Sequence, residues 1–122
     1  MKKILVVEDN EQNMYLFRYI LNNSGYEVIE SRTGEEGVEL AKNKKPDLVI
    51  MDIQLPDIDG LEATKRIKEF EGNEDLPIIA VTSYAMVGDR EKILSAGCVG
   101  YIEKPIKPDT FILEIEKYLS KE

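Results

Sequence analysis

Apolar residues along the chain alternate between short continuous runs and segments with helical spacing. Three runs, at positions 4–7, 48–51 and 78–81, are entirely apolar and rich in β-branched side chains. Such runs are typical of strands that are buried on both faces, as in the interior of a parallel sheet. The segments 26–31 and 99–103 are more mixed, which predicts two further strands at the edges of that sheet.

Between these runs, residues that can face a core recur every three or four positions, which predicts five helices. Ser24-Gly25, Lys45-Pro46 and Ala96-Gly97 are suited to close the first, second and fourth helices, and Pro108 is suited to open the fifth. The positions that mark the five helices are Met14, Leu16, Phe17, Ile20 and Leu21; Val38, Leu40 and Ala41; Leu61, Thr64, Ile67 and Lys68; Ile93 and Leu94; and Phe111, Ile112, Ile115 and Leu119.

Five strands that alternate with five helices predict an α/β fold with a parallel sheet covered by helices on both faces. A chain of 122 residues is too short for a (β/α)₈ barrel, which requires about 250 residues. We therefore expect a flavodoxin-like (βα)₅ three-layer sandwich. Because no repeat or linker interrupts the pattern, residues 1–122 are expected to form one domain.

Composition excludes several classes of chemistry. The chain contains no histidine and one cysteine, Cys98, so it cannot hold a Ser-His-Asp triad, an internal disulfide or a thiolate zinc site. The formal charge of −8 argues against direct binding of nucleic acid, which requires a basic surface. No signal peptide and no apolar run of roughly 20 residues is present, so we expect a cytoplasmic protein without membrane insertion. Cys98 itself is expected to be a small buried side chain.

Polar side chains follow four of the predicted strands. Glu8 and Asp9 come after the first strand, Asp52 after the third, Thr82 at the end of the fourth and Lys104 after the fifth. The carboxyl ends of parallel strands meet at one edge of the sheet, where ligands bind in open α/β folds. The sequence therefore predicts that three carboxylates, a hydroxyl and an ammonium lie close together.

Taken singly, each of these residues has an ordinary structural explanation. Asp9 or Asn10, for example, is suited to cap the first helix. The set is harder to explain in that way, because two like charges about 4 Å apart repel by roughly 4 kcal/mol at an effective dielectric constant of 20. A hard cation such as Mg²⁺ removes this cost, since it takes carboxylate and water oxygens as ligands.

A carboxylate, a hard metal, a lysine and a hydroxyl are together the groups needed for phosphoryl transfer. The cation and the ammonium neutralise the phosphoryl oxygens, and the hydroxyl donates a hydrogen bond to one of them. One carboxylate is then available as the nucleophile. Asp52 is the best candidate, because the central strand places it between the acidic pair and Lys104.

These motifs resemble the receiver domain of two-component response regulators, the CheY-like family, and the match spans essentially the whole chain. The order and the spacing of the motifs are specific to that family. Within the family, the stretches 52–56 and 85–89 resemble the stand-alone DivK type. The resemblance implies a five-stranded sheet with the spatial order 2-1-3-4-5. The motifs that carry it are Glu8-Asp9-Asn10, Met51 to Pro56, Thr82-Ser83 and Tyr101 to Pro105.

The resemblance also implies a metal site and a phosphoacceptor. Asp52 would accept a phosphoryl group, and Mg²⁺, or alternatively Mn²⁺, would be the cofactor. Asp9, Asp52 and the backbone carbonyl of Gln54 would bind the cation directly. Glu8, which stands where the family more often has aspartate, would act largely through water.

Further roles are implied around the phosphoryl group. Lys104 would contact its oxygens, and the peptide bond between Lys104 and Pro105 would be cis. Thr82 would move to hydrogen-bond the phosphorylated Asp52, and Tyr101 would move inward with it. The protein would thus be a phosphoacceptor that assists its own phosphorylation and dephosphorylation, and not an enzyme.

The donor implied by the resemblance is a phosphohistidine on a histidine kinase or a histidine phosphotransfer protein. A downstream protein would bind the face formed by the fourth helix, the fifth strand and the fifth helix, and Leu113 is hypothesised to border that face. Tyr15 and Tyr19, four residues apart on the first helix, are a hypothetical surface for the donor. The alternative is that the two rings only cover local helix surface.

Other interpretations fit less of the sequence. A haloacid-dehalogenase-type phosphatase requires a second aspartate two residues after the nucleophile, where this chain has Gln54. A nucleotide- or flavin-binding protein requires a phosphate loop rich in glycine or hydroxyls, whereas residues 8–11 are acidic. A receiver domain that works without phosphorylation would be favoured if Asp52, Asp9, Thr82 or Lys104 were replaced, and none of them is. A receiver domain excised from a hybrid histidine kinase remains as an alternative.

Overall fold

The computed structural model describes residues 1–83 and 87–119. Ala85 and Met86, which belong to the stretch 85–89 that resembles the DivK type, lie outside the described residues. Strands and helices alternate along the chain, as the hydrophobic pattern predicts. The elements are β1 (Lys3–Val7), α1 (Glu11–Asn23), β2 (Glu27–Ser31), α2 (Gly34–Lys44), β3 (Leu48–Asp52), α3 (Gly60–Lys68), β4 (Ile78–Thr82), α4 (Val87–Ser95), β5 (Gly100–Glu103) and α5 (Pro108–Leu119).

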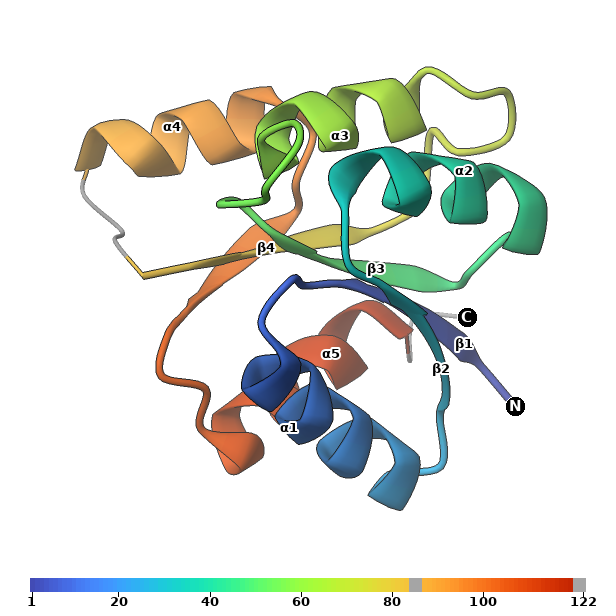
Figure 1. Cartoon of the computed structure of the whole chain (residues 1–122), viewed down its shortest axis with the longest axis vertical. Coiled ribbons are helices and arrows are strands. Elements are labelled where there is room, and N and C mark those ends of the chain that lie inside the picture. The colour runs from blue at the N-terminus through green and yellow to red at the C-terminus, as the bar shows by residue number, and fades with distance from the viewer. Residues whose placement is uncertain (84–86, 120–122) are drawn as a thin grey trace.

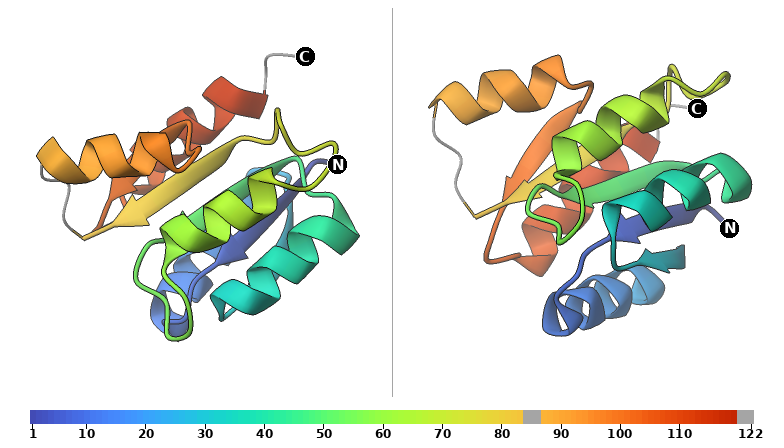
Figure 2. Two further views of the ribbon diagram at one scale, coloured as in Figure 1. Left: turned by 90° about the horizontal axis from the view of Figure 1, so that it is seen from above. Right: turned by 45° about the horizontal axis from the view of Figure 1, so that its top comes forward.

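The five strands form one parallel sheet with the order β2-β1-β3-β4-β5, which confirms the predicted topology. The two mixed strands, β2 and β5, lie at the edges. Figure 1 shows α1 and α5 on one face of the sheet and α2, α3 and α4 on the other. In the view from above in Figure 2, the latter three helices lie in front of the sheet.

Each face of the sheet has its own hydrophobic core, because successive side chains of a strand point to opposite faces. On β1, Ile4 and Val6 pack with residues of α1 and α5, whereas Leu5 and Val7 pack with residues of α2 and α3. The rings of Phe17 and Phe111 lie 5.3 Å apart between α1 and α5. Burial on both faces explains why the central strands are continuously apolar.

Three predicted strand starts and one predicted core position require correction. β1 begins one residue earlier than its apolar run, at Lys3, while β2 and β5 begin one residue later than expected, at Glu27 and Gly100. Leu94 was expected on the apolar side of the fourth helix but is 48% exposed, whereas its neighbour Ile93 is buried. Neighbours on a helix point about 100° apart, and Ile93 is the one that faces the core. Cys98 is buried as expected and lies 3.8 Å from the Thr64 hydroxyl.

The ends of the helices are fixed by specific caps. Asn10, and not Asp9, caps α1, since its side-chain oxygen accepts a hydrogen bond from the backbone N–H of Asn13 at 2.9 Å. Thr33 caps α2, and Asp59 caps α3. The Asp9 side chain is therefore not the cap of α1 and can take part in a site at the carboxyl edge of the sheet. None of the helices in residues 1–83 and 87–119 has the length and apolar character needed to span a membrane.

Candidate functional site

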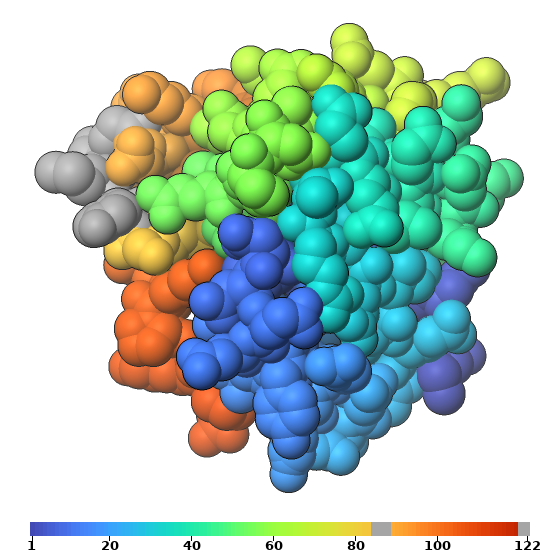
Figure 3. Space-filling model, viewed as in Figure 1, coloured from blue at the N-terminus to red at the C-terminus, as the bar shows by residue number. Residues whose placement is uncertain are grey.

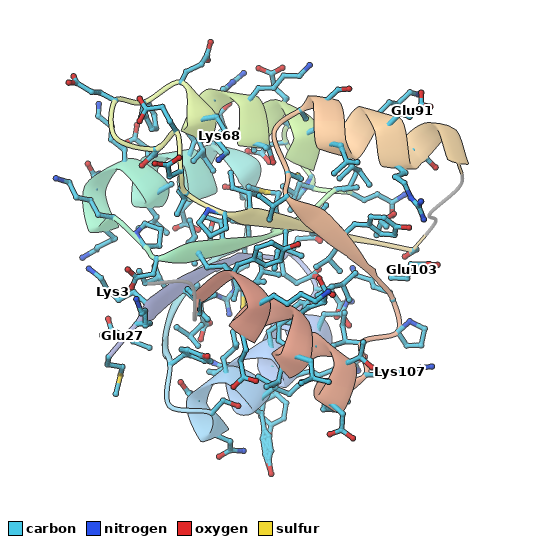
Figure 4. All side chains as sticks on the ribbon, turned by 180° about the vertical axis from the view of Figure 1, so that it is seen from behind. Lys3, Glu27, Lys68, Glu91, Glu103 and Lys107 are labelled. Atoms are coloured by element: carbon cyan, nitrogen blue, oxygen red, sulfur yellow. The ribbon has the colours of Figure 1, made fainter. Side chains whose placement is uncertain are left out.

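Strand register brings the predicted polar residues to one edge of the sheet. Backbone hydrogen bonds continue past the strand ends, from Glu8 N–H to the Ser31 carbonyl and from Lys104 N–H to the Thr82 carbonyl, at 2.9 and 2.8 Å. Asp52, the last residue of β3, pairs with Val81. Figure 4 shows Glu103, at the end of β5, on the opposite side of the molecule from Lys3 and Glu27, which begin β1 and β2.

Three carboxylates gather at this edge. Each of Glu8, Asp9 and Asp52 offers one oxygen, and these oxygens all lie within 4.8 Å of one another. Glu8 is 1% exposed and Asp52 is 4% exposed, whereas Asp9 is exposed to solvent. The cluster is therefore buried on the side of the sheet and open on the side of Asp9.

Lys104 supplies a positive charge to the buried pair. Its Nζ lies 3.3 Å from Oδ2 of Asp52 and 3.2 Å from Oε1 of Glu8. The lysine donates a hydrogen bond to Asp52, but its geometry toward Glu8 is that of an ion pair only. Oε1 of Glu8 has no hydrogen-bond partner among the described residues.

The remaining oxygens of this pair accept bonds from backbone amides. The N–H of Asn10 donates to Oε2 of Glu8 at 3.2 Å, and the N–H of Gln54 donates to Oδ1 of Asp52 at 3.1 Å. The chain that follows β3 thus bends back over the Asp52 carboxylate. This bend leaves the segment after Asp52 beside the acidic cluster.

Crowding of like charges changes the proton affinity of the pair. Burial, a side-chain hydrogen bond with Asp52 and the charge of Asp52 all raise the pKa of Glu8, the Asn10 amide and the charge of Lys104 lower it, and the result is a pKa of about 7. Burial lowers the pKa of Lys104, but the charges of Asp52 and Glu8 outweigh burial, so this pKa is raised overall. One ammonium therefore does not neutralise the cluster.

The donors of the cluster fit a hard divalent cation. All three side chains supply oxygen ligands, which Mg²⁺ and Mn²⁺ prefer. Oε1 of the buried Glu8 forms an ion pair with Lys104 but accepts no hydrogen bond among the described residues, and the raised pKa of Glu8 indicates negative charge in the cluster that this one ammonium does not fully compensate. A cation beside the exposed Asp9 would compensate it.

Thr82 and Tyr101, the two predicted switch residues, have different surroundings. Thr82 ends β4, is 7% exposed and lies opposite Glu103 in the sheet. The Tyr101 hydroxyl accepts hydrogen bonds from the guanidinium of Arg90 on α4, at 2.8 and 3.2 Å. Arg90 was not identified from the sequence, because an arginine in the first turns of a helix carries no motif. The peptide between Lys104 and Pro105 is cis, as the family resemblance implies.

Gly60 packs tightly beneath the site. Its N–H donates to the Ile53 carbonyl at 2.8 Å. A Cβ atom at this position would overlap the backbone carbonyl of Asp52 and would lie 2.8 Å from Cα of Ile53. Only glycine allows α3 to begin so close to the end of β3.

The exposed residues on α1 and α5 form one surface. Tyr15 and Tyr19 are 64% and 53% exposed, and their rings stack 6.4 Å apart. Leu113 is 65% exposed but lines a groove between α1 and α5 together with Leu16 and Tyr19. Leu113 thus lies on the α1 side of α5, and its hypothesised place at the border of the α4-β5-α5 face stays a prediction. We call Tyr15, Tyr19 and Leu113 the α1–α5 apolar surface.

Comparisons with known proteins agree on one family. A family model for the response regulator receiver domain matches residues 4–116. The polar-differentiation response regulator DivK of Brucella ovis is 51% identical over 118 residues, which are 97% of this chain and 96% of the relative.

Solved structures give the same result. A CheY-like receiver domain protein from Methanospirillum hungatei is 31% identical, with a TM-score of 0.92 over 99% of this chain and 95% of that one. The receiver domain of a sensor histidine kinase from Pseudomonas aeruginosa, which has a magnesium ion coordinated in its active-site cleft, is 35% identical, with a TM-score of 0.92 over 98% of both chains. The chain belongs to the response regulator receiver domain family, and it is a DivK-like receiver domain of a two-component response regulator.

Proposed function

We propose that this protein is a phosphorylation switch in which Asp52 accepts a phosphoryl group from a phosphohistidine on another protein. The observation that carries the proposal is the meeting of Asp52, two further carboxylates and Lys104 at one sheet edge. In this proposal residues 1–122 act as a single cytoplasmic receiver domain that binds no nucleic acid.

The proposed transfer step forms one bond and breaks one. An oxygen of the Asp52 carboxylate forms a bond to phosphorus, while the bond between phosphorus and the donor's imidazole nitrogen breaks and leaves its electron pair on that nitrogen. Lys104, 3.3 Å from Oδ2 of Asp52, stabilises negative charge on the phosphoryl oxygens. The buried pair is then converted from two carboxylates to one carboxylate and one acyl phosphate.

Mg²⁺ is the proposed cofactor, as it is the ion coordinated in the Pseudomonas aeruginosa relative. When bound, it supplies positive charge that neutralises the phosphoryl oxygens. Asp9, Asp52 and the backbone carbonyl of Gln54 would hold it directly, and Glu8 would act largely through water. The exposed position of Asp9 suits a cation that enters from solvent.

The proposed output is a change in the balance between two conformations. The phosphoryl group favours the state in which the Thr82 hydroxyl donates to it and Tyr101 turns inward. Because the Tyr101 hydroxyl accepts bonds from Arg90, an inward turn breaks a contact between β5 and α4. A downstream protein would bind the altered α4-β5-α5 face.

Acetyl phosphate, a small phosphoryl donor, tests the transfer chemistry without the natural partner. Intact-mass measurement of the protein with acetyl phosphate and Mg²⁺ is expected to show the gain of one phosphoryl group. Asp52→Asn should abolish the gain, and removal of Mg²⁺ with a chelator should suppress it. An unchanged gain in Asp52→Asn would show that another residue is the acceptor.

The proposed donor surface is formed by Tyr15 and Tyr19 of the α1–α5 apolar surface, because both are exposed and lie on α1, which begins two residues after Asp9. Its test compares Tyr15→Ala/Tyr19→Ala with the parent in two reactions. Transfer from a phosphohistidine protein should slow by at least about tenfold, since exposed aromatic residues are frequent binding hot spots. Transfer from acetyl phosphate should not change. Equal rates with the protein donor would remove this surface from the proposal.

A further inference from the structure

The loop between β3 and α3, residues 53–59, is hydrogen-bonded to the start of α2. The Asp57 carboxylate accepts two backbone hydrogen bonds from the start of α2. Oδ1 accepts from the N–H of Gly34 and Oδ2 from the N–H of Glu35, both at 2.8 Å. Figure 3 shows the green surface around this loop next to the teal surface of the start of α2.

The loop and the helix also fit closely at the neighbouring residues. A Cβ atom on Gly34 would lie 2.5 Å from Cγ1 of Ile58 and 3.4 Å from Oδ1 of Asp57. Ile58 contributes to the core on this side of the sheet. The absence of a side chain at Gly34 therefore lets the loop pack directly against the first turn of α2.

The two ends of the loop are fixed as well. At its start, the N–H of Gln54 donates to Asp52, and the Ile53 carbonyl accepts from the N–H of Gly60. At its end, Asp59 accepts bonds from the N–H groups of Leu61 and Glu62 at 2.8 and 2.9 Å. Between these two ends, Asp57 ties the loop to α2 by accepting hydrogen bonds from the N–H groups of Gly34 and Glu35.

We propose that Asp57 is a positioning residue that holds the 53–59 loop against α2 and thereby sets the affinity of the site for a divalent cation. The inference rests on the proposed function, in which the Gln54 carbonyl of this loop is a cation ligand. Asp57 follows Gln54 by three residues. Its hydrogen bonds to α2 therefore hold the chain in place just after the Gln54 carbonyl.

The reason for a large effect is the geometry that the cation demands. Mg²⁺ requires nearly ideal octahedral coordination and tolerates little displacement of a ligand. Residues that orient ligands without touching the metal typically contribute about 10- to 100-fold to metal affinity. The alternative is that Asp57 only caps α2, which would affect stability but not cation binding.

Thr33 provides a matched control, because it caps the same helix end without holding the loop. Its hydroxyl accepts a bond from the N–H of Glu36 at 3.1 Å. Mg²⁺ affinity would be measured by calorimetric titration of the full chain, for the parent and for Asp57→Ala, Asp57→Asn and Thr33→Ala, at a temperature where thermal melts show every variant to be folded.

We expect Asp57→Ala to weaken Mg²⁺ binding by on the order of tenfold, whereas Thr33→Ala keeps the parent affinity and loses only stability. Asp57→Asn retains one acceptor oxygen and should fall between the parent and Asp57→Ala. In the metal-free protein, hydrogen exchange at the Gly60 amide should quicken in Asp57→Ala but not in Thr33→Ala, because a released loop exposes its bond to Ile53 more often.

Two negative outcomes have different meanings. A parent that binds Mg²⁺, together with an Asp57→Ala variant of equal affinity and a loss of stability like that of Thr33→Ala, would reduce Asp57 to a helix cap and leave the proposed function intact. A parent that binds no Mg²⁺ and gains no phosphoryl group would overturn the proposed function and this inference together.

Discussion

At the scale of single residues, the burial of Glu8 is connected to its chemistry. A carboxyl group that is 1% exposed and faces another carboxylate is stabilised in its protonated form. In the absence of a cation, protonation of Glu8 relieves the repulsion of Asp52. Binding of a cation would relieve it in a different way, so protons and cations are expected to compete at this position.

The raised pKa of Glu8 gives a prediction for stability against pH. The unfolded chain releases this proton near the ordinary pKa of 4.5, but the folded chain keeps it until about pH 7. In that window the folded state binds more protons, so the free energy of unfolding falls as pH rises. The metal-free parent should therefore lose on the order of 2–3 kcal/mol relative to Glu8→Gln between about pH 4.5 and 7.

Chemical denaturation in a chelating buffer, at several pH values, measures this difference. Glu69→Gln, which removes an exposed carboxylate on the far end of α3, is the control and should follow the parent. If the difference in unfolding free energy between the parent and Glu8→Gln did not change with pH, Glu8 would have its ordinary pKa in the folded state.

Asp9 offers a second prediction at this scale. Because it is exposed, the repulsion that it adds is that of charges about 4 Å apart in water, about 1 kcal/mol. Asp9→Asn should raise the melting temperature of the metal-free protein by about 4 °C and should weaken Mg²⁺ binding. A lower melting temperature in a thermal scan would mean that Asp9 has a stabilising partner.

The residue types at the site could be predicted from the sequence, but their surroundings could not. Strand ends located Glu8, Asp9, Asp52, Thr82 and Lys104, because the hydrophobic runs show where strands stop. The sequence does not show that Glu8 is buried while Asp9 is exposed, since this depends on how the chain turns after β1. Asp57 and Arg90 were missed because their partners lie on other elements.

At the scale of elements, the contact between β3 and α3 determines how the loop after Asp52 is closed. Gly60 lets the first turn of α3 lie against the backbone of Asp52. A side chain at this point must displace the backbone that carries the proposed phosphoacceptor. Stability and chemistry are therefore linked through one small residue.

Gly60→Ala is accordingly expected to cost about 2 kcal/mol or more of unfolding free energy and to slow phosphorylation by acetyl phosphate. Gly34→Ala is the comparison, because its added atom meets a side chain, Cγ1 of Ile58 at 2.5 Å, whereas the added atom at Gly60 meets backbone. Denaturant titrations of both variants measure the difference. A smaller loss for Gly60→Ala would show that the backbone relaxes there at little cost.

Element types and order were predictable, because the two hydrophobic periods are clear in this sequence. Which residues of an outer helix are buried was harder to predict. Leu94 has helical spacing, yet it is exposed, and Leu113, which is not among the core-facing positions of α5, lines a groove beside α1. Whether such a residue faces a core, a groove or water depends on the neighbouring helix, and the period within one helix carries no information about that neighbour.

At the scale of the whole molecule, cation binding should stabilise the fold. A ligand at 100 times its dissociation constant adds about 2.7 kcal/mol to the free energy of unfolding. Saturating Mg²⁺ should therefore raise the melting temperature of the parent, and Asp52→Asn should lose most of this increase. NaCl at equal ionic strength is the control, because general screening of the net charge of −8 would act on both proteins.

The sheet order has a consequence for when the protein acquires its chemistry. Glu8, Asp52 and Lys104 come from β1, β3 and the end of β5, so the first and last of them are separated by almost the whole chain. A polypeptide that ends before residue 104 lacks the ammonium, and one that ends before residue 100 lacks β5 as well. The contact of the ammonium with both buried carboxylates can therefore form only in a polypeptide that already extends through residue 104.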